Sequence, residues 1–166
     1  DTPSIEKKET VIAISRDEAL SKSERIQFEN NNIIGSISLK GASIDDLTFK
    51  KYKVSLDKED KVTLLGPRNI NEGYLIESGF VTSDKNIDVP NSKTIWSLEG
   101  NNKLTNKSPV KLSWTNNQGL KFEKEISLDD EYLFTVKQKV INKTNNKYDF
   151  YSYGQIIRNE IPEIID

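Results

Sequence analysis

The sequence predicts an all-β fold, an antiparallel β-sandwich made of two sheets. Hydrophobicity has a period of two from about Arg25 to Ile157, and no stretch sustains the period of a helix. Turn-forming residues separate the short apolar runs at close spacing. Repeated half-buried strands of this kind are stable when two sheets pack face to face. At 166 residues the chain is long enough to bury one core, so we expect a single domain.

Residues 1–24 are polar and charged apart from a short apolar run at 11–14, which predicts a flexible linker ahead of a β-sandwich domain at 25–166. A hairpin comes first, because Ile33, Gly35 and Ile37 share one face of a strand and residues 40–42 supply a break. The predicted strands are 33–39, 44–52, 62–65, 74–82, 94–98, 110–115, 120–128, 132–142 and 148–157.

The strand that begins at Tyr132 illustrates the pattern. Phe134 and Val136 fall on the same side as Tyr132, whereas Thr135 and Lys137 fall on the other. One face of this strand is therefore predicted to be buried and the other to be solvated.

Composition excludes several classes of function. The 24 basic and 26 acidic residues are interspersed and give a net charge of −2, so nucleic acid is not an expected partner. The apolar runs are only a few residues long, far below the roughly 20 needed to span a bilayer, so this chain is not expected to span a membrane. The absence of cysteine and histidine removes thiolate sites and the commonest general base. We expect no catalysis, no metal and no cofactor.

A collinear series of segments between about residues 24 and 160 resembles the periplasmic domain of the YidC/Oxa1 family of bacterial membrane protein insertases. The segments are 34–52, 63–67, 74–79, 89–90, Trp96, 109–114, 119–122 and 129–136. The resemblance implies a two-sheet supersandwich, related in architecture to galactose mutarotase. That supersandwich has more strands than the nine counted above, so the chain is expected to be the N-terminal part of the domain or a short version of it.

The resemblance also implies a location and a role. Residues 1–24 would follow a removed transmembrane anchor, at the periplasmic face of the inner membrane. The family inserts and folds inner-membrane proteins, alone or with the Sec translocon, through a groove that lies outside this chain. The domain is expected to be a non-catalytic scaffold that contacts Sec accessory subunits and nascent membrane proteins. Mutarotase chemistry relies on histidines with an acidic partner, and this chain has no histidine.

The last predicted strand has apolar or aromatic residues on both faces. The candidate partner-contact residues are Tyr148, Phe150, Tyr151, Tyr153, Ile156 and Ile157. An uncovered strand edge with apolar neighbours is a site for pairing with another chain. Burial on both faces is also normal for a strand inside a sandwich, so the sequence leaves both interpretations open.

An alternative function is a carbohydrate- or peptide-binding module. Trp96 and Trp114 could form an aromatic platform for a ligand, although aromatics at alternating strand positions more often belong to a core. Exposed rings on a concave face would favour the ligand platform, and buried rings would favour the scaffold.

Two pairs of adjacent carboxylates, Asp45–Asp46 and Asp129–Asp130, would suit acid–base chemistry or a hard cation. Adjacent residues of a strand point to opposite faces, so neither pair can converge on one atom without a turn. We interpret both pairs as turn residues.

Overall fold

The computed structural model describes residues 13–160, in which eleven strands and one short helix form. The elements are α1 (Arg16–Ser21), β1 (Arg25–Glu29), β2 (Ile33–Ser38), β3 (Ile44–Lys53), β4 (Lys61–Leu65), β5 (Tyr74–Val81), β6 (Ser97–Glu99), β7 (Lys103–Leu104), β8 (Val110–Thr115), β9 (Leu120–Leu128), β10 (Phe134–Asn142) and β11 (Tyr151–Arg158). Residues 1–12 of the predicted linker and 161–166 of the predicted domain lie outside the described residues.

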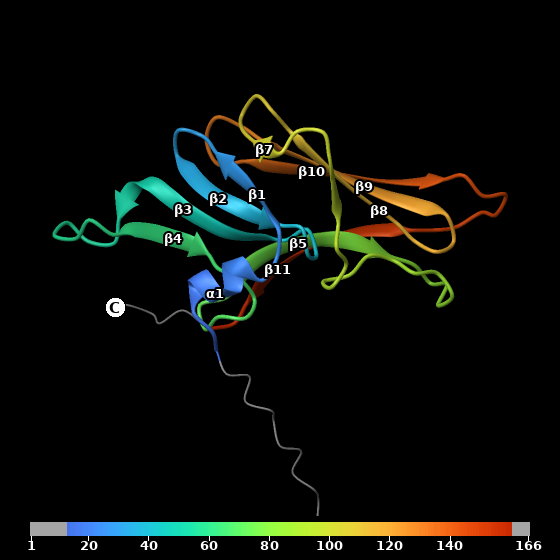
Figure 1. Cartoon of the computed structure of the whole chain (residues 1–166), viewed down its shortest axis with the longest axis horizontal. Helices are drawn as coiled ribbons and strands as arrows, with labels where there is room; N and C mark the ends of the chain where they lie inside the picture. Colours follow the sequence, from blue (N-terminus) through green and yellow to red (C-terminus); the bar gives the residue numbers. More distant parts are fainter. Residues whose placement is uncertain (1–12, 161–166) are drawn as a thin grey trace, which may run out of the picture.

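The strands form two sheets that face each other across a core (Figure 1). The seven-stranded sheet has the order β11-β5-β3-β2-β1-β7, with β4 paired to β3. The four-stranded sheet has the order β10-β9-β8-β6. The pairing is antiparallel apart from the short β1–β7 contact. The predicted all-β sandwich is confirmed.

The β8–β9 hairpin shows why these residues fold locally as they do. Asn116 closes the turn, since its side-chain Oδ1 accepts the backbone N–H groups of Gln118 and Leu120 at 3.0 and 2.9 Å. Gly119 has a φ of 81°, a conformation that residues with a Cβ rarely adopt. Both strands have the predicted bounds.

Sequence periodicity missed β1 and β7 and misplaced three strand boundaries. Asn30 explains the first miss, because its Oδ1 accepts the N–H groups of Asn32 and Ile33 and so turns the chain between β1 and β2. β6 lies at Ser97–Glu99 instead of 94–98. β10 and β11 each begin a few residues after the predicted start.

The core lies between the sheets and is centred on Phe122, which is fully buried. Its ring contacts three other aromatic rings, with centroid distances of 5.1 Å to Phe80, 5.5 Å to Phe150 and 5.7 Å to Trp114. Rings at such separations contribute beyond the area that they bury. This cluster joins β5, β8 and β9 to the segment that precedes β11.

α1 lies against the face of the seven-stranded sheet that points away from the four-stranded sheet (Figure 1). Ser15 caps the helix, because its hydroxyl accepts the N–H of Glu18 at 3.2 Å. Ala19 is the buried residue of the helix. Arg16 donates to the carbonyl oxygen of Leu65 at 2.9 Å, which joins the helix to β4.

The loop at 66–73 holds both ends of the described chain. The backbone N–H of Ile14 donates to the carbonyl oxygen of Asn69 at 3.4 Å. Asn159 donates to three carbonyl oxygens of this loop, those of Arg68 (2.7 Å), Ile70 (2.8 Å) and Gly73 (2.8 Å). The segments that begin and end the described fold therefore leave the sandwich side by side (Figure 1).

Candidate functional site

A β-bulge in β3 brings two adjacent carboxylates together. Across the β2–β3 pair, Ser36 lies opposite Asp46 and Ile37 lies opposite Ile44, so Asp45 is an extra residue without a partner. The sequence-based interpretation of Asp45–Asp46 as a turn is therefore wrong. The expectation that the two side chains point apart fails for the same reason, because a bulge interrupts the alternation of a strand.

Both carboxylates are neutralised by arginines. Arg25 pairs with Asp45, and Arg16 of α1 pairs with Asp46. Ser36 connects the two pairs, since its hydroxyl donates to Asp46 Oδ2 at 2.7 Å and accepts from Arg25 Nε at 2.7 Å. Only 9% of each side chain of the Arg25–Asp45 pair is exposed. This network joins α1 to the sheet. Its carboxylates are bonded to Arg16, Arg25 and Ser36, which supports a structural role.

Burial raises the pKa of Asp45 above its ordinary value, even though the Arg25 guanidinium beside it acts in the opposite direction. The charge of Asp46 also raises this pKa. Arg25 is thus the residue that most favours the ionised form of Asp45 in the fold.

The second predicted turn is confirmed. Asp129 Oδ1 accepts the backbone N–H groups of Glu131 and Leu133, both at 2.9 Å. These bonds stabilise the turn between β9 and β10, so the role of the Asp129 carboxylate is structural.

Lys124 crosses the interior from one sheet to the other. It belongs to β9, is 1% exposed and bonds through Nζ to Ser78 of β5, to its carbonyl oxygen and, at 3.0 Å, to its hydroxyl. The ammonium group also lies 5.1 Å from the centroid of the Trp96 ring. Nearby, Gln138 Nε2 of β10 donates to the carbonyl oxygen of Gly79 at 3.1 Å. These contacts form a polar layer between the sheets.

Burial lowers the pKa of Lys124 from 10.5 to about 8. Between these two values the unfolded chain holds the proton and the folded chain does not, so the stability of the fold decreases as the pH falls through this window. Relative to that of Lys124→Met, the free energy of unfolding of the wild type should fall by about 3 kcal/mol between pH 10.5 and pH 8. It should fall no further below pH 8. Urea unfolding of both proteins across this range measures the difference.

Lys137→Met is the matched control, because the Lys137 side chain is 72% exposed. Its stability difference from the wild type should stay constant over the same pH window. A pH-independent difference between the wild type and Lys124→Met would show that the Lys124 amine is not desolvated.

The outer face of the four-stranded sheet is a lattice of cross-strand ion pairs. Lys121 donates to Glu99 at 2.7 Å, and Glu123 accepts from Lys111 at 3.3 Å. Hydrogen bonds from Lys121 and then Ser113 lower the pKa of Glu99 to about 2. This face is solvated and charged, which suits neither an apolar partner nor an aromatic ligand platform.

The two tryptophans occupy different environments and do not share a surface. Trp96 is 2% exposed and lies in the core, whereas Trp114 is half-buried against Phe122. No aromatic platform forms from this pair, which favours the scaffold interpretation.

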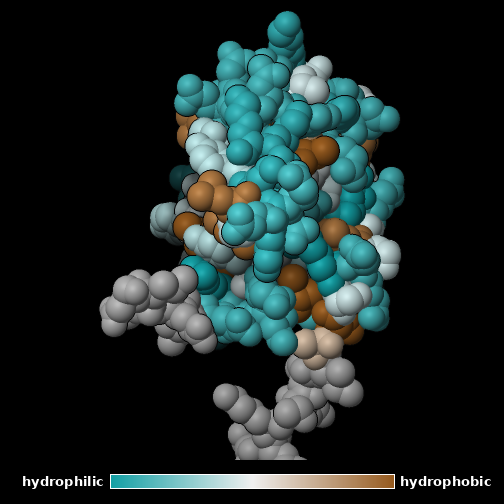
Figure 2. All heavy atoms as spheres, turned by 90° about the vertical axis from the view of Figure 1, so that its left-hand side faces the viewer, coloured by the Kyte–Doolittle hydropathy of each residue, from teal (hydrophilic) through white to brown (hydrophobic). Residues whose placement is uncertain are grey.

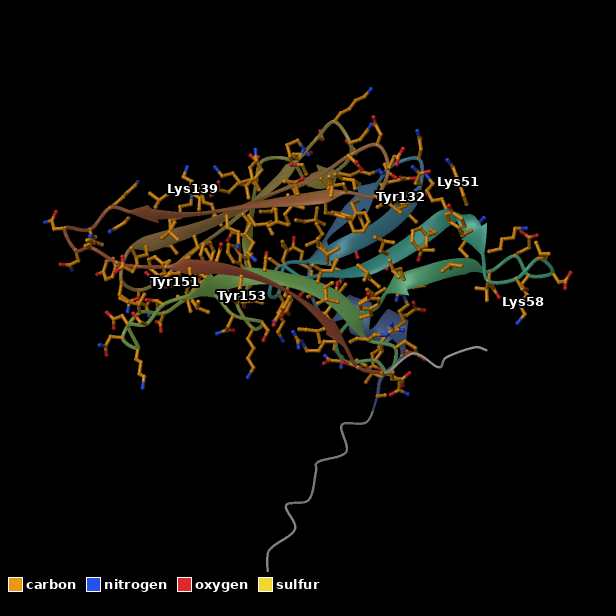
Figure 3. All side chains as sticks on the ribbon, turned by 180° about the vertical axis from the view of Figure 1, so that it is seen from behind. Lys51, Lys58, Tyr132, Lys139, Tyr151 and Tyr153 are labelled. Atoms are coloured by element: carbon orange, nitrogen blue, oxygen red, sulfur yellow. The ribbon has the colours of Figure 1, made fainter. Side chains whose placement is uncertain are left out.

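The candidate partner-contact residues divide into two groups. Tyr148 and Phe150 precede β11 and pack against the core. Tyr151 and Ile156 are 66% and 67% exposed, on opposite faces of β11, while Tyr153 and Ile157 are half-buried. Figure 3 shows Tyr151 and Tyr153 side by side along the strand.

β11 is an edge strand of the seven-stranded sheet. All eight of its residues pair with β5, and in the described residues no strand pairs with its other side. Alternate residues of such a strand direct their N–H and C=O groups away from the sheet.

A further surface feature is a groove that sequence analysis did not predict. It has a volume of about 570 Å³ and is mainly apolar. Its lining residues are Ile33, Leu47, Phe49, Tyr52, Lys53, Val62, Leu64 and Tyr132. Figure 2 views the molecule from the side of the β3–β4 hairpin, where hydrophobic side chains interrupt the polar surface. The groove depends on Tyr132 meeting β3, a contact between distant parts of the chain that leaves no local pattern.

Comparison with known protein families identifies the family of the chain. The sequence profile of the YidC periplasmic domain matches residues 25–164. The chain belongs to this family. The resemblance carried by the segments from 34 to 136 is confirmed.

Relatives with the name membrane protein insertase YidC support the assignment. The chain is 62% identical over 164 residues to the protein from Pelagibacter ubique, with 99% of this chain and 29% of that protein covered. It is 42% identical over 151 residues to the protein from Brucella suis, with 90% and 25% covered. It is 38% identical over 157 residues to the protein from Mesorhizobium japonicum, with 94% and 26% covered. The chain thus spans between a quarter and a third of the length of these YidC proteins.

Residues 13–160 contain no helix that is long and apolar enough to cross a bilayer. Within the same residues, no group of three or more acidic side chains comes together as a metal site would require.

Proposed function

We propose that this YidC periplasmic domain is a non-catalytic scaffold of an inner-membrane insertase, and that β11 is its contact with an accessory subunit of the Sec translocon. The observation that supports this proposal is the edge of β11 that no strand of residues 13–160 covers. Edge strands that remain uncovered are usually short, or are protected by charges or proline. β11 is eight residues long, and Arg158 at its end is its only charged residue.

The side chains of β11 fit an added strand. Ile156 lies opposite Ile76 of β5 and is 67% exposed, so an apolar side chain of a partner strand could cover it. Tyr151 and Tyr153 lie on the other face of the strand, where they offer apolar rings with polar hydroxyls. A partner strand would gain backbone hydrogen bonds from the edge and specificity from these side chains.

Photocrosslinking in membranes tests this proposal. A photoreactive residue at Tyr151 or Ile156 of the full-length protein should crosslink to a Sec accessory subunit. The matched control is Lys139, which is 66% exposed on the outer face of the other sheet (Figure 3) and should give no such crosslink. Crosslinks confined to the domain itself, or equal crosslinks from Lys139, would refute the β11 contact.

The apolar groove favours a second candidate, capture of an extended apolar segment of a nascent membrane protein. Phe49 and Tyr132 form a T-shaped pair in the groove, with ring centroids 5.9 Å apart, and Phe49 forms a second T-shaped pair with Tyr52 at 5.5 Å. Such rings supply a large apolar contact surface. In the same crosslinking experiment, a photoreactive residue at Tyr132 would then label nascent chains, whereas one at Tyr151 would label the translocon.

A further inference from the structure

A basic crevice lies beneath α1, on the face of the seven-stranded sheet that points away from the four-stranded sheet. Its volume is about 250 Å³. Its basic lining residues are Lys22, Arg25, Lys40, Arg68 and Lys93. Asp45 is the one carboxylate among the described residues that line it. The crevice therefore gathers cations from the C-cap of α1, from β1, from the β2–β3 turn and from two loops.

Two of these cations have no ion-pair partner within the described residues. Lys22 pairs with Glu18 at 3.5 Å, and Arg25 pairs with Asp45. By contrast, Lys40 and Lys93 form no ion pair with any residue of 13–160, and both are exposed. The crevice thus retains positive charge after its internal pairs are counted.

Arg68 and hydroxyl groups complete a set of donors. Arg68 bonds to Glu77 through one guanidinium nitrogen, at 2.5 Å, and its side chain is 43% exposed. The guanidinium group has further N–H groups that can donate to a ligand. Ser43 and Ser92 also line the crevice, and the Ser43 hydroxyl makes only a long contact of 3.4 Å with a backbone carbonyl. Ammonium, guanidinium and hydroxyl donors around one space suit a tetrahedral oxyanion.

We propose that this crevice binds a phosphate group, either the phosphodiester of an anionic lipid headgroup or a free phosphate ion. The lipid source rests on the proposed function, in which this domain is part of an inner-membrane insertase. α1 and the loop at 66–73 line the crevice, and the described chain enters and leaves the fold at that loop. In an insertase held at the membrane, a basic crevice at this position could meet lipid headgroups, where each lysine adds to the attraction of an anionic surface.

Vesicle sedimentation tests the lipid source. The chain should bind vesicles of phosphatidylcholine mixed with phosphatidylglycerol more tightly than vesicles of phosphatidylcholine alone. The affinity of the double variant Lys40→Gln/Lys93→Gln for the mixed vesicles should be lower than that of the wild type by a factor of roughly ten or more. The control Lys58→Gln/Lys139→Gln changes the net charge equally, at the β3–β4 tip and on the other sheet (Figure 3), and should bind like the wild type.

Titration with inorganic phosphate, followed by NMR, tests the free ion. The backbone amides of Lys40, Arg68 and Lys93 should shift in the wild type and in the control, and not in Lys40→Gln/Lys93→Gln. Phosphate shifts without vesicle binding would assign the crevice to the free ion. Vesicle binding that depends on Lys40 and Lys93 would assign it to a lipid headgroup.

The proposal is overturned if neither probe binds, or if both double variants weaken binding equally, which would indicate net charge instead of a site. These results are separate from the crosslinks at β11. Loss of the translocon crosslinks would refute the scaffold contact and leave phosphate binding by the crevice unaffected.

Discussion

Replacing Trp96 with alanine is expected to lower the free energy of unfolding by about 3–5 kcal/mol. The Trp96 side chain is among the largest that are fully buried, and its ring lies against the ammonium group of Lys124. Its removal would leave a cavity between the sheets and take away the ring that faces a buried cation. Equilibrium unfolding in urea, with constant slope, measures the change.

Trp114→Ala is the matched control for this substitution. The same side chain is removed from a half-buried position against Phe122, so the expected loss is smaller, about 1–2 kcal/mol. Equal losses for the two variants would contradict the placement of Trp96 in the core. A change near zero for Trp96→Ala, with altered binding of a glycan or peptide, would restore the ligand-platform interpretation.

The substitution Arg25→Met is also expected to destabilise the fold by about 3–5 kcal/mol at neutral pH. Methionine keeps most of the aliphatic stem but removes the charge that neutralises Asp45. The Asp45 side chain is only 9% exposed, so its carboxylate would remain buried without a counter-charge. Ser36 would also lose the donor that connects the two carboxylates.

The loss in Arg25→Met should depend on pH. Burial already raises the pKa of Asp45, and removal of Arg25 would raise it further. Below that raised pKa the folded carboxyl takes up a proton and its buried charge disappears, so the loss should shrink as the pH falls. Lys139→Met removes an exposed ammonium group that lies 3.6 Å from Glu123, and Glu123 keeps Lys111 and Lys121 as partners, so the change should cost less than about 1 kcal/mol. A pH-independent loss in Arg25→Met would contradict the role of Asp45.

The sequence predicted the fold best where turn chemistry and strand period agree. β8 and β9 have the predicted bounds because Asn116 and Gly119 supply the side-chain acceptor and the positive φ that the turn requires. The separate strand β1 was missed although Asn30, Asn31 and Asn32 are turn-forming residues, and the Asn30 side chain closes the turn that separates β1 from β2.

The candidate sites depend on contacts between distant residues, which explains what the sequence missed. The bulge at Asp45 arises from the register of β2 against β3, and the network adds Arg16 from a helix outside the sheet. The crevice under α1 likewise brings Lys40 and Lys93 together from separate loops. Sequence analysis did single out the final strand, and its partner contacts remain a prediction for the crosslinking experiment.

The loop at 66–73 has a mechanical consequence. Pulling the two flanking segments apart would load its bonds to Ile14 and Asn159 before it loads the ladders between strands. Bonds arranged in one loop open one after another under force, whereas strand ladders resist shear together. The sandwich would therefore keep its shape under tension while its point of attachment gives way. Under force, the flanking segments would thus detach from the loop at 66–73 before the sheets deform.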